Sequence, residues 1–400
     1  MTASPPATAL PIRRLLIAIV MVMVSTLPVF LTGASFIQLQ ADLGLKATSL
    51  GIVTAAFFLA ASITSTPLGR LVERIGWRTA MRINCVVSAV VVILIAITVH
   101  SPWSLGALLL ASGVVYGFTN PAANHALAHG SPPGRRGVVF GLKHAGIPAS
   151  TLAAGASVPL LVLTVGWRPT FAVAALPALV AWLLIGSDRE TEPGTTPAEA
   201  TRPGRSNALL SPGQLITLAI GSSCATWTAV FLGSFLVAAA VDASFTQSQA
   251  GTLLFAGSVV SIVARVTYGA VADRRSAAGF VGVGLIMGLG AIVVLTVADA
   301  HGLGFIVGVL AAFALGWGWP GLLTYAVVNA NTATAASSSA VTQAGVFLGA
   351  GLGPIAIGAV VEHWSFRAAW LIDAALLAVA AAVVISVAMT RRRRELVVHP

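Results

Sequence analysis

Apolar residues fill long stretches of this 400-residue chain, and short polar turns separate them. A helix needs about 20 mostly apolar residues to cross about 30 Å of hydrocarbon. The pattern therefore predicts an all-α membrane protein with twelve transmembrane helices, over residues 15–37, 50–68, 83–99, 105–127, 138–165, 170–185, 215–239, 250–270, 280–297, 303–328, 339–361 and 368–389. The first stretch follows Arg13 and Arg14, as in a signal peptide, but it is too long for one and we interpret it as the first span.

The composition supports this interpretation. Hydrophobic residues make up 57% of the chain and charged residues only 8%, and the mean hydropathy is +0.93. Soluble domains are about one quarter charged, so the lipid bilayer is the expected partner of most of this surface. Cys85 and Cys224 lie in separate apolar stretches, and two such thiols indicate neither a disulfide framework nor a metal site.

Basic residues are distributed unevenly between the two sides of the predicted membrane domain. Of the 22 Lys and Arg residues, 17 fall on the side that holds both chain ends, 3 fall on the opposite side and 2 lie within spans. The positive-inside rule then predicts a multi-pass protein of the cytoplasmic membrane with both termini in the cytoplasm. The same distribution explains the net charge of +10. The basic residues are topology signals and contacts for lipid headgroups, and they do not indicate a nucleic-acid-binding surface.

The longest polar segment divides the chain into two halves. Residues 187–212 carry several Pro and Gly residues and mixed charges, which is typical of a flexible linker. We predict a cytoplasmic tail at 1–14, a six-helix bundle at 15–186, a cytoplasmic linker at 187–212, a second six-helix bundle at 213–390 and a basic tail at 391–400.

The two halves repeat each other at a nearly constant offset. Gly51 corresponds to Gly251 at 200 residues, and the other pairs match at 199 or 200. These pairs are Asp42 with Asp242, Gly117-x-x-x-Pro121 with Gly316-x-x-x-Pro320, His144-Ala-Gly with Gln343-Ala-Gly, and Trp167-Arg168 with Phe366-Arg367. Chance does not hold one offset over five sites, so the halves are parallel repeats with pseudo-symmetric folds.

A charged loop follows the second span. Residues 69–78 read GRLVERIGWR and fit the pattern Gly-x-x-x-acid-Arg-x-Gly-x-Arg, and a shorter copy runs from Gly269 to Arg275. This loop resembles the one between the second and third spans of major facilitator superfamily transporters, and the repeat extends the resemblance over the whole chain. The resemblance implies two six-helix bundles around a central site that opens alternately to each side.

In that family the loop helps to latch one conformation. An acid at a helix end can cap another helix N-terminus, and arginines can bind backbone carbonyls or the acid. The resemblance gives this latch role to Gly69, Glu73, Arg74, Arg78, Asp273 and Arg274. Glu73 stands where the family most often has Asp. The alternative is a positive-inside turn without a latch.

Arg265 lies inside the eighth predicted span, four residues before Gly269. A charge there is costly and is expected to face the bundle interior or a cavity. Its position resembles that of the substrate-binding arginine of monocarboxylate and oxalate transporters, and a guanidinium matches a carboxylate bidentately. The chain departs from the monocarboxylate carriers at Ser261, where they have an acid, and from nitrate carriers at Ser65, which lacks their second Arg. The alternative is a structural Arg that binds backbone carbonyls.

Lys143 and His144 lie in the fifth span, which faces the eighth span in the resembled fold. Lys143 and Arg265 are at similar depth and together could form a cationic site for an anion. Lys143 could instead extend to the interface, and His144 could carry a proton or serve as a structural hydrogen-bonding group. The complete set of expected substrate-binding residues is Arg265, Lys143, His144, Asn120, Asn124, Trp227, Trp317, Tyr325 and Gln343.

Several classes of function lack the residues that they require. The Gly316-x-Gly318-x-x-Gly321 spacing lies inside a span with no preceding strand, so it does not indicate dinucleotide binding. The chain has no Gly-Lys-Ser/Thr loop for a nucleotide phosphate and no catalytic or metal-ligand cluster. We therefore expect no enzyme activity, no cofactor and no metal.

These observations predict a secondary active transporter that works by alternating access and functions as a monomer. Its expected substrate is a small organic or inorganic anion, with proton or ion coupling. One alternative is a proton-coupled exporter of amphipathic compounds, favoured by the aromatic residues but lacking an evident acid in spans one and four. Another alternative is a membrane sensor or assembly partner that does not transport. Asp373 in the last span is either a coupling residue or an interior polar contact.

Overall fold

The computed structural model describes residues 12–128, 136–185, 210–274, 279–331 and 334–398, and within these ranges it contains helices and turns but no β-strand. Twelve helical segments in the described ranges are long and apolar enough to cross a membrane, and each overlaps one predicted span. The predicted all-α membrane fold is therefore confirmed. Most of the predicted linker at 187–212 lies outside the described residues.

The described part of the first half contains ten helical elements that make six spans. In chain order they are α1 (Ile12–Ala34), α2 (Phe36–Leu43), α3 (Ala47–Ile75), α4 (Trp77–Thr98), α5 (Pro102–Ala128), α6 (Arg136–His144), α7 (Gly146–Ser157) with η1 (Val158–Val162), and α8 (Trp167–Val173) with α9 (Ala175–Ile185). The element α2 was not predicted as a separate helix, and it lies just beyond the end of the first span.

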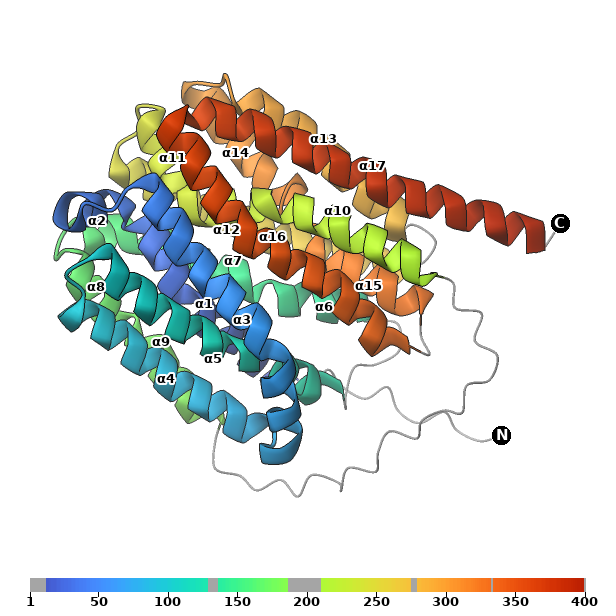
Figure 1. The fold of residues 1–400 in the computed structure, drawn as a ribbon, viewed down its shortest axis with the longest axis horizontal. Helices are drawn as coiled ribbons and strands as arrows, with labels where there is room; N and C mark the ends of the chain where they lie inside the picture. Colours follow the sequence, from blue (N-terminus) through green and yellow to red (C-terminus); the bar gives the residue numbers. More distant parts are fainter. Residues whose placement is uncertain (1–11, 129–135, 186–209, 275–278, 332–333, 399–400) are drawn as a thin grey trace.

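The second half also makes six spans. Its elements are α10 (Pro212–Val230), η2 (Phe231–Phe235) and α11 (Leu236–Asp242), α12 (Gln247–Arg274), α13 (Gly279–Val297), α14 (Gly302–Leu315) and α15 (Pro320–Ala330), α16 (Ala335–His363) and α17 (Phe366–Val398). Figure 1 shows the first half, in blue to green, beside the second half, in yellow to red. We call the end that holds the start of α1 and the end of α17 the terminal end, and the opposite end the distal end.

Glycine and proline interrupt two spans at particular places. Pro148 cannot donate a backbone N–H to the carbonyl of His144, and the helix breaks between them at Ala145. In the tenth span the break at residues 316–319 contains two glycines and immediately precedes Pro320. Both breaks lie where the two bundles face each other, and both are used by the site described below.

Large apolar side chains cover the outer surface of the bundles. Leu160, Leu183 and Ile292 are each more than 60% exposed, and they lie on three different spans. An apolar surface of this extent is not stable against water, but it is expected in contact with lipid. The interior is filled by buried aromatic and aliphatic residues, such as Phe231 against Trp370 with ring centroids 4.1 Å apart.

The two bundles meet along two main seams. We call the contact of α6 and α7 with α12 the first seam, and the contact of α3 with α16 the second seam. Close backbone approach is possible because glycines lie at both: a side chain at Gly269 would collide with the carbonyl of Gly137, and one at Gly51 would collide with the carbonyl of Pro354. Figure 1 shows α3 and α16 side by side near α2 and diverging toward the terminal end.

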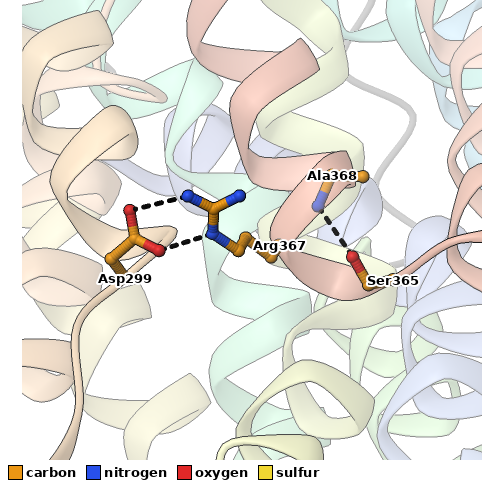
Figure 2. A network of polar contacts seen from close by, with 4 residues as sticks. All are labelled: Asp299, Ser365, Arg367 and Ala368. Carbon is orange, nitrogen blue, oxygen red and sulfur yellow. Dashed lines mark hydrogen bonds and ion pairs between the residues drawn. The ribbon is translucent and has the colours of Figure 1, made fainter.

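A polar network secures the distal end of the second bundle (Figure 2). The guanidinium of Arg367 donates to both carboxylate oxygens of Asp299, from Nε at 2.5 Å and from an Nη at 3.2 Å. The hydroxyl of Ser365 accepts the N–H of Ala368 and so satisfies a free donor at the start of α17. The ion pair ties the turn after α13 to the start of α17.

Candidate functional site

A cavity of about 70 Å³ lies between the two bundles. Side chains from both halves line it: Val22, Tyr116, Asn120, Lys143, His144, Ile147, Ser222, Thr226, Arg265, Trp317, Trp319, Pro320, Leu323, Thr324, Thr342, Gln343 and Val346. A space of this size holds several water molecules or a small ion, whereas pockets for drug-sized ligands have about 300–1,000 Å³.

Arg265 is held at the wall of this cavity by three contacts. Its side chain is 2% exposed, Nε donates to the hydroxyl of Ser261 at 3.3 Å, and Nη2 donates to the carbonyl of Trp317 at 2.6 Å. Its guanidinium also lies over the Trp317 ring, 5.6 Å from the centroid. Nη1 is buried and has no hydrogen-bond partner among the described residues. This guanidinium nitrogen therefore has donor capacity left for a ligand.

The helix break in the tenth span explains why Trp317 can hold Arg265. Within a continuous helix its carbonyl would accept the N–H of residue 321, but the helix α15 begins only at Pro320. The freed carbonyl accepts from Arg265 instead. The ring of Trp317 is fixed in turn by Phe313 and Phe30, with centroids at 5.6 Å and 6.3 Å. The break thus positions the guanidinium on a rigid aromatic support.

Lys143 and His144 reach the cavity from the opposite bundle. Lys143 is 8% exposed, and both residues end α6 just before the break at Ala145. A side chain at Gly141 would lie against the backbone of Arg265, so α6 is packed directly onto α12 at this depth. The structure therefore brings the two predicted cationic residues to one cavity.

The charge of the lining has one sign. Lys143 and Arg265 are basic, and the described residues that line the cavity include no Asp and no Glu. The guanidinium of Arg265 therefore has no carboxylate among the described lining residues to offset the cost of its buried charge. The amide groups of Asn120 and Gln343 add polar groups that can donate hydrogen bonds, whereas the Thr226 hydroxyl donates to the carbonyl of Ser222.

Six of the nine expected site residues line the cavity, namely Arg265, Lys143, His144, Asn120, Trp317 and Gln343. Trp227 and Tyr325 are not among the described lining residues. The Tyr325 hydroxyl donates to the carbonyl of Ala272 at 3.2 Å, and Trp227 packs against Gly353. The side chain of Asn124 lies outside the described residues.

The sequence analysis omitted several residues of the lining, and the repeat contained the signal for one of them. Thr342 is the equivalent of Lys143 at the offset of 199 residues, just as Gln343 is the equivalent of His144. Tyr116 lies one helical turn before Asn120, and Ser222 one turn before Thr226. Applying the offset and the helical period to the expected residues would have predicted these neighbours.

The expected latch residues divide into two groups. Both carboxylate oxygens of Asp273 accept backbone N–H groups at the start of α6, from Gly137 at 2.7 Å and from Val138 at 3.0 Å. The carboxylate at the end of one bundle's helix therefore caps a helix of the other bundle. Arg274 is exposed at the end of α12.

In the first bundle the equivalent loop is more open. Glu73 and Arg74 are exposed at the end of α3, and the guanidinium of Arg78 lies over the Trp77 ring, 5.1 Å from its centroid. Gly69 faces Pro121 at an ordinary contact distance. The start of α16, which is the repeat equivalent of the start of α6, is only partly described.

Comparison with known proteins agrees with this architecture. The family model described as the Major Facilitator Superfamily matches residues 18–351, and a second match covers residues 218–399. The second match begins in the second repeat, as expected for a fold made of two similar halves. A search of curated proteins gives no match to this chain. The chain is thus a multi-pass membrane protein that belongs to the Major Facilitator Superfamily, a family of secondary transporters.

Proposed function

We propose that this transporter carries a small anion and binds it in the cavity between Arg265 and Lys143. The observation that carries the proposal is the cationic lining: two buried basic side chains with no carboxylate among the described lining residues. The buried Nη1 of Arg265 adds a donor without a partner among the described residues. A carboxylate or a planar inorganic anion would satisfy it with a charge-assisted hydrogen bond.

The second bundle would supply the anchor and the first bundle the supporting charge. Alternating access requires each bundle to hold part of the ligand, because the ligand must remain bound while one end closes and the other opens. Arg265 belongs to α12 and Lys143 to α6, so one anion in the cavity would bridge the two bundles. Its bridging contacts would favour the state in which the bundles are close.

We further propose that the terminal end faces the cytoplasm. This orientation is supported by the distribution of Arg residues, including Arg70, Arg74 and Arg274 at that end, which the positive-inside rule assigns to the cytoplasmic side. The distal end, with Lys46 and Arg367, would then face outward.

The direct test is a thermal-shift experiment on purified protein with sodium formate, acetate, lactate and nitrate, and with tetraphenylphosphonium as an amphipathic cation. A ligand that binds the folded state raises the melting temperature, and at a hundred times Kd it adds about 2.7 kcal/mol. We expect stabilisation by at least one anion. In Arg265→Gln its affinity should fall more than about tenfold, because a buried charge contact is worth about 2 kcal/mol or more.

Arg70→Gln, at an exposed position on α3, is the matched control and should respond like the wild type. Lys143→Gln provides a second variant, since Arg265 also holds Trp317 and its replacement could affect folding. An anion that stabilises wild type and both cavity variants equally would contradict the proposed site. Stabilisation by tetraphenylphosphonium alone would favour an exporter of amphipathic compounds, with the aromatic residues of the cavity as its binding surface.

A further inference from the structure

A carboxylic acid is buried inside the second bundle, outside the cavity lining. Asp373 lies on α17, is 1% exposed, and its Oδ1 accepts the hydroxyl of Thr228 on α10 at 2.9 Å. Oδ2 is buried and has no hydrogen-bond partner among the described residues. Trp370 and Leu377, one turn away on either side, are buried in the apolar core.

No cation on the described elements that pack here offsets the charge of Asp373. Among the titratable side chains, α10 contributes only the thiol of Cys224, while α13, α14 and η2 contribute none. On α16, Glu362 and His363 lie at the distal end, where Glu362 pairs with Lys46 of the other bundle.

Among the described side chains of α17, the remaining charged groups are engaged at its two ends. Arg367 is paired with Asp299, and the guanidinium of Arg391 lies over the Phe280 ring. On α15, the hydroxyl of Tyr325 donates to a carbonyl of α12. An ionised carboxylate at Asp373 is therefore costly in this packing, and a neutral one avoids that cost. Intramembrane acids of this kind are retained where a function requires them.

The same helix break that positions Arg265 also touches the partner of Asp373. A side chain at Gly316 would lie 2.8 Å from the methyl group of Thr228, so the break packs tightly against this residue. The next residue, Trp317, lines the cavity and holds Arg265 through its carbonyl. A continuous path of packed contacts thus joins Asp373, Thr228, the break and the guanidinium.

We propose that Asp373 is a proton-binding site that couples anion transport to proton movement. The inference rests on the proposed anion transport. One proton from the aqueous phase on one side binds the carboxylate to form the carboxylic acid, and the same proton leaves to water on the other side. The neutral acid is compatible with the closed packing of α10 against α17. The ionised form needs water or a new partner for Oδ2, and so favours a state in which this interface opens.

The path to the cavity gives the coupling its physical basis. Movement of Thr228 when α10 and α17 separate releases the contact with Gly316 and so changes the support of Trp317. Because Trp317 holds Arg265, protonation and anion binding act on the same short segment. The proton and the anion then both act on the helix break at residues 316–319. Reciprocal coupling between two sites requires such a shared element with two states.

The first test measures the proton itself and needs no substrate. Infrared difference spectra of purified protein, recorded from acidic to alkaline pH in H2O and D2O, report the carbonyl band of a protonated carboxylic acid. We expect a band that disappears with rising pH, is missing from Asp373→Asn and persists in Asp299→Asn, the matched control at the distal surface. A band assigned to Asp373 that never titrates, or the absence of any such band, would overturn the proposal.

The second test separates coupling from transport. In proteoliposomes loaded with formate or nitrate, Asp373→Asn should retain exchange of the anion across the membrane, but its accumulation ratio under an imposed pH gradient should fall to one. The amide keeps an oxygen that accepts from Thr228, so the fold is preserved, and Thr228→Val removes that hydrogen bond while keeping the acid.

Wild-type accumulation by Asp373→Asn would overturn the inference. Failure of the wild type to exchange any tested anion would contradict the proposed function instead, while the infrared titration still decides whether Asp373 binds a proton.

Discussion

The two seams between the bundles are related by the internal repeat, yet they differ in extent. At the first seam glycines allow close approach at both ends: Gly137 with Gly269 toward the terminal end, and Gly155 with Gly251 toward the distal end. At the second seam the close approach is confined to the distal half, where Gly51 meets Pro354.

Beyond its distal half, each helix of the second seam packs on its own bundle. A side chain at Gly345 of α16 would collide with Ala219 of α10, and one at Gly117 of α5 would collide with Thr64 of α3. The bundles are therefore joined along the whole first seam but separate along the second toward the terminal end (Figure 1). An entry route to the cavity at the terminal end is expected along α3 and α16.

The two seams also differ in their carboxylate contacts. At the terminal end of the first seam Asp273 caps α6, whereas at the distal end of the second seam Glu362 accepts the N–H of Thr48 at the start of α3. The Nζ of Lys46 lies 3.5 Å from the same carboxylate of Glu362. Each seam is thus fastened by an acid of the second bundle on a helix start of the first, but at opposite ends. Alternating access requires these two contacts to break in different steps.

The largest effect is expected where the first seam is tightest. In Gly137→Val the new side chain would collide with the carbonyl of Gly269 and crowd the carboxylate of Asp273. Overpacking of this kind typically costs about 1–3 kcal/mol. We expect a lower melting temperature and loss of most anion uptake in proteoliposomes, because the terminal end can no longer close at this seam.

Gly282→Val is the matched control for this variant. Gly282 lies on α13, and a side chain there would meet only Leu322 at an ordinary 3.8 Å. It should keep both stability and uptake. Normal uptake by Gly137→Val would mean that the first seam need not close so tightly during transport, and the contrast between the seams would lose its functional meaning.

A smaller effect should distinguish the two repeat-equivalent acids. Asp273→Ala removes a cap with two accepted N–H groups, and loss of such a cap costs about 0.5–2 kcal/mol. Glu73→Ala removes an exposed side chain and should change little. The readout is the rate of maleimide labelling of a cysteine at Val346, in a background without Cys85 and Cys224, since Val346 lines the cavity.

We expect labelling to become about 2- to 30-fold faster in Asp273→Ala, which is the population shift that this loss of free energy produces. Glu73→Ala should label at nearly the wild-type rate. Equal acceleration in both variants would indicate that the two loops are equivalent latches, as the sequence alone predicted. In that case the asymmetry between them in this structure would describe only one state of the transport cycle.

The sequence was sufficient for the spans because a helix that faces lipid must be apolar for about 20 residues. The sequence also placed Arg265 and Lys143 in the bundle interior, since a charge inside a span is rare and faces the interior or a cavity. The sequence did not determine which aromatic residues line the cavity. Trp227 and Tyr325 fill the packed interior as well as they would line a cavity, and the choice depends on helix rotation.

Helix breaks were the other feature that composition did not determine. Gly316, Gly318 and Pro320 were visible in the sequence, but a bilayer span can retain its helix through such residues when neighbouring groups satisfy the backbone. Here the guanidinium of Arg265 satisfies the freed carbonyl of Trp317. The break and the buried charge therefore depend on each other, and neither could be inferred from one segment alone.

The distal ends of the two repeats show the same contrast on a smaller scale. Arg168 in the first repeat donates to the backbone carbonyls of Ala96 and Val99, at 3.2 Å and 2.7 Å. Its equivalent Arg367 binds the side chain of Asp299, which stands at the position of Val99 after an offset of 200 residues. Arg168 thus binds backbone carbonyls, which do not titrate. Arg367 binds a carboxylate, which does titrate (Figure 2).

The smallest predicted effect follows from this difference. The hydrogen bonds from Arg367 hold the pKa of the Asp299 carboxyl below its usual value. A carboxyl whose pKa is lower in the folded state stabilises the fold above its unfolded pKa, and the stabilisation is lost as the pH falls through the folded pKa. Asp299→Asn should therefore melt slightly below wild type at neutral pH, and the two melting curves should converge in acid. The effect is small because the pair is exposed.

Arg168→Gln should differ from wild type by the same amount at every pH in this range, because its carbonyl partners do not titrate. Parallel pH dependence of the two variants would contradict this assignment of the titrating contact to Asp299.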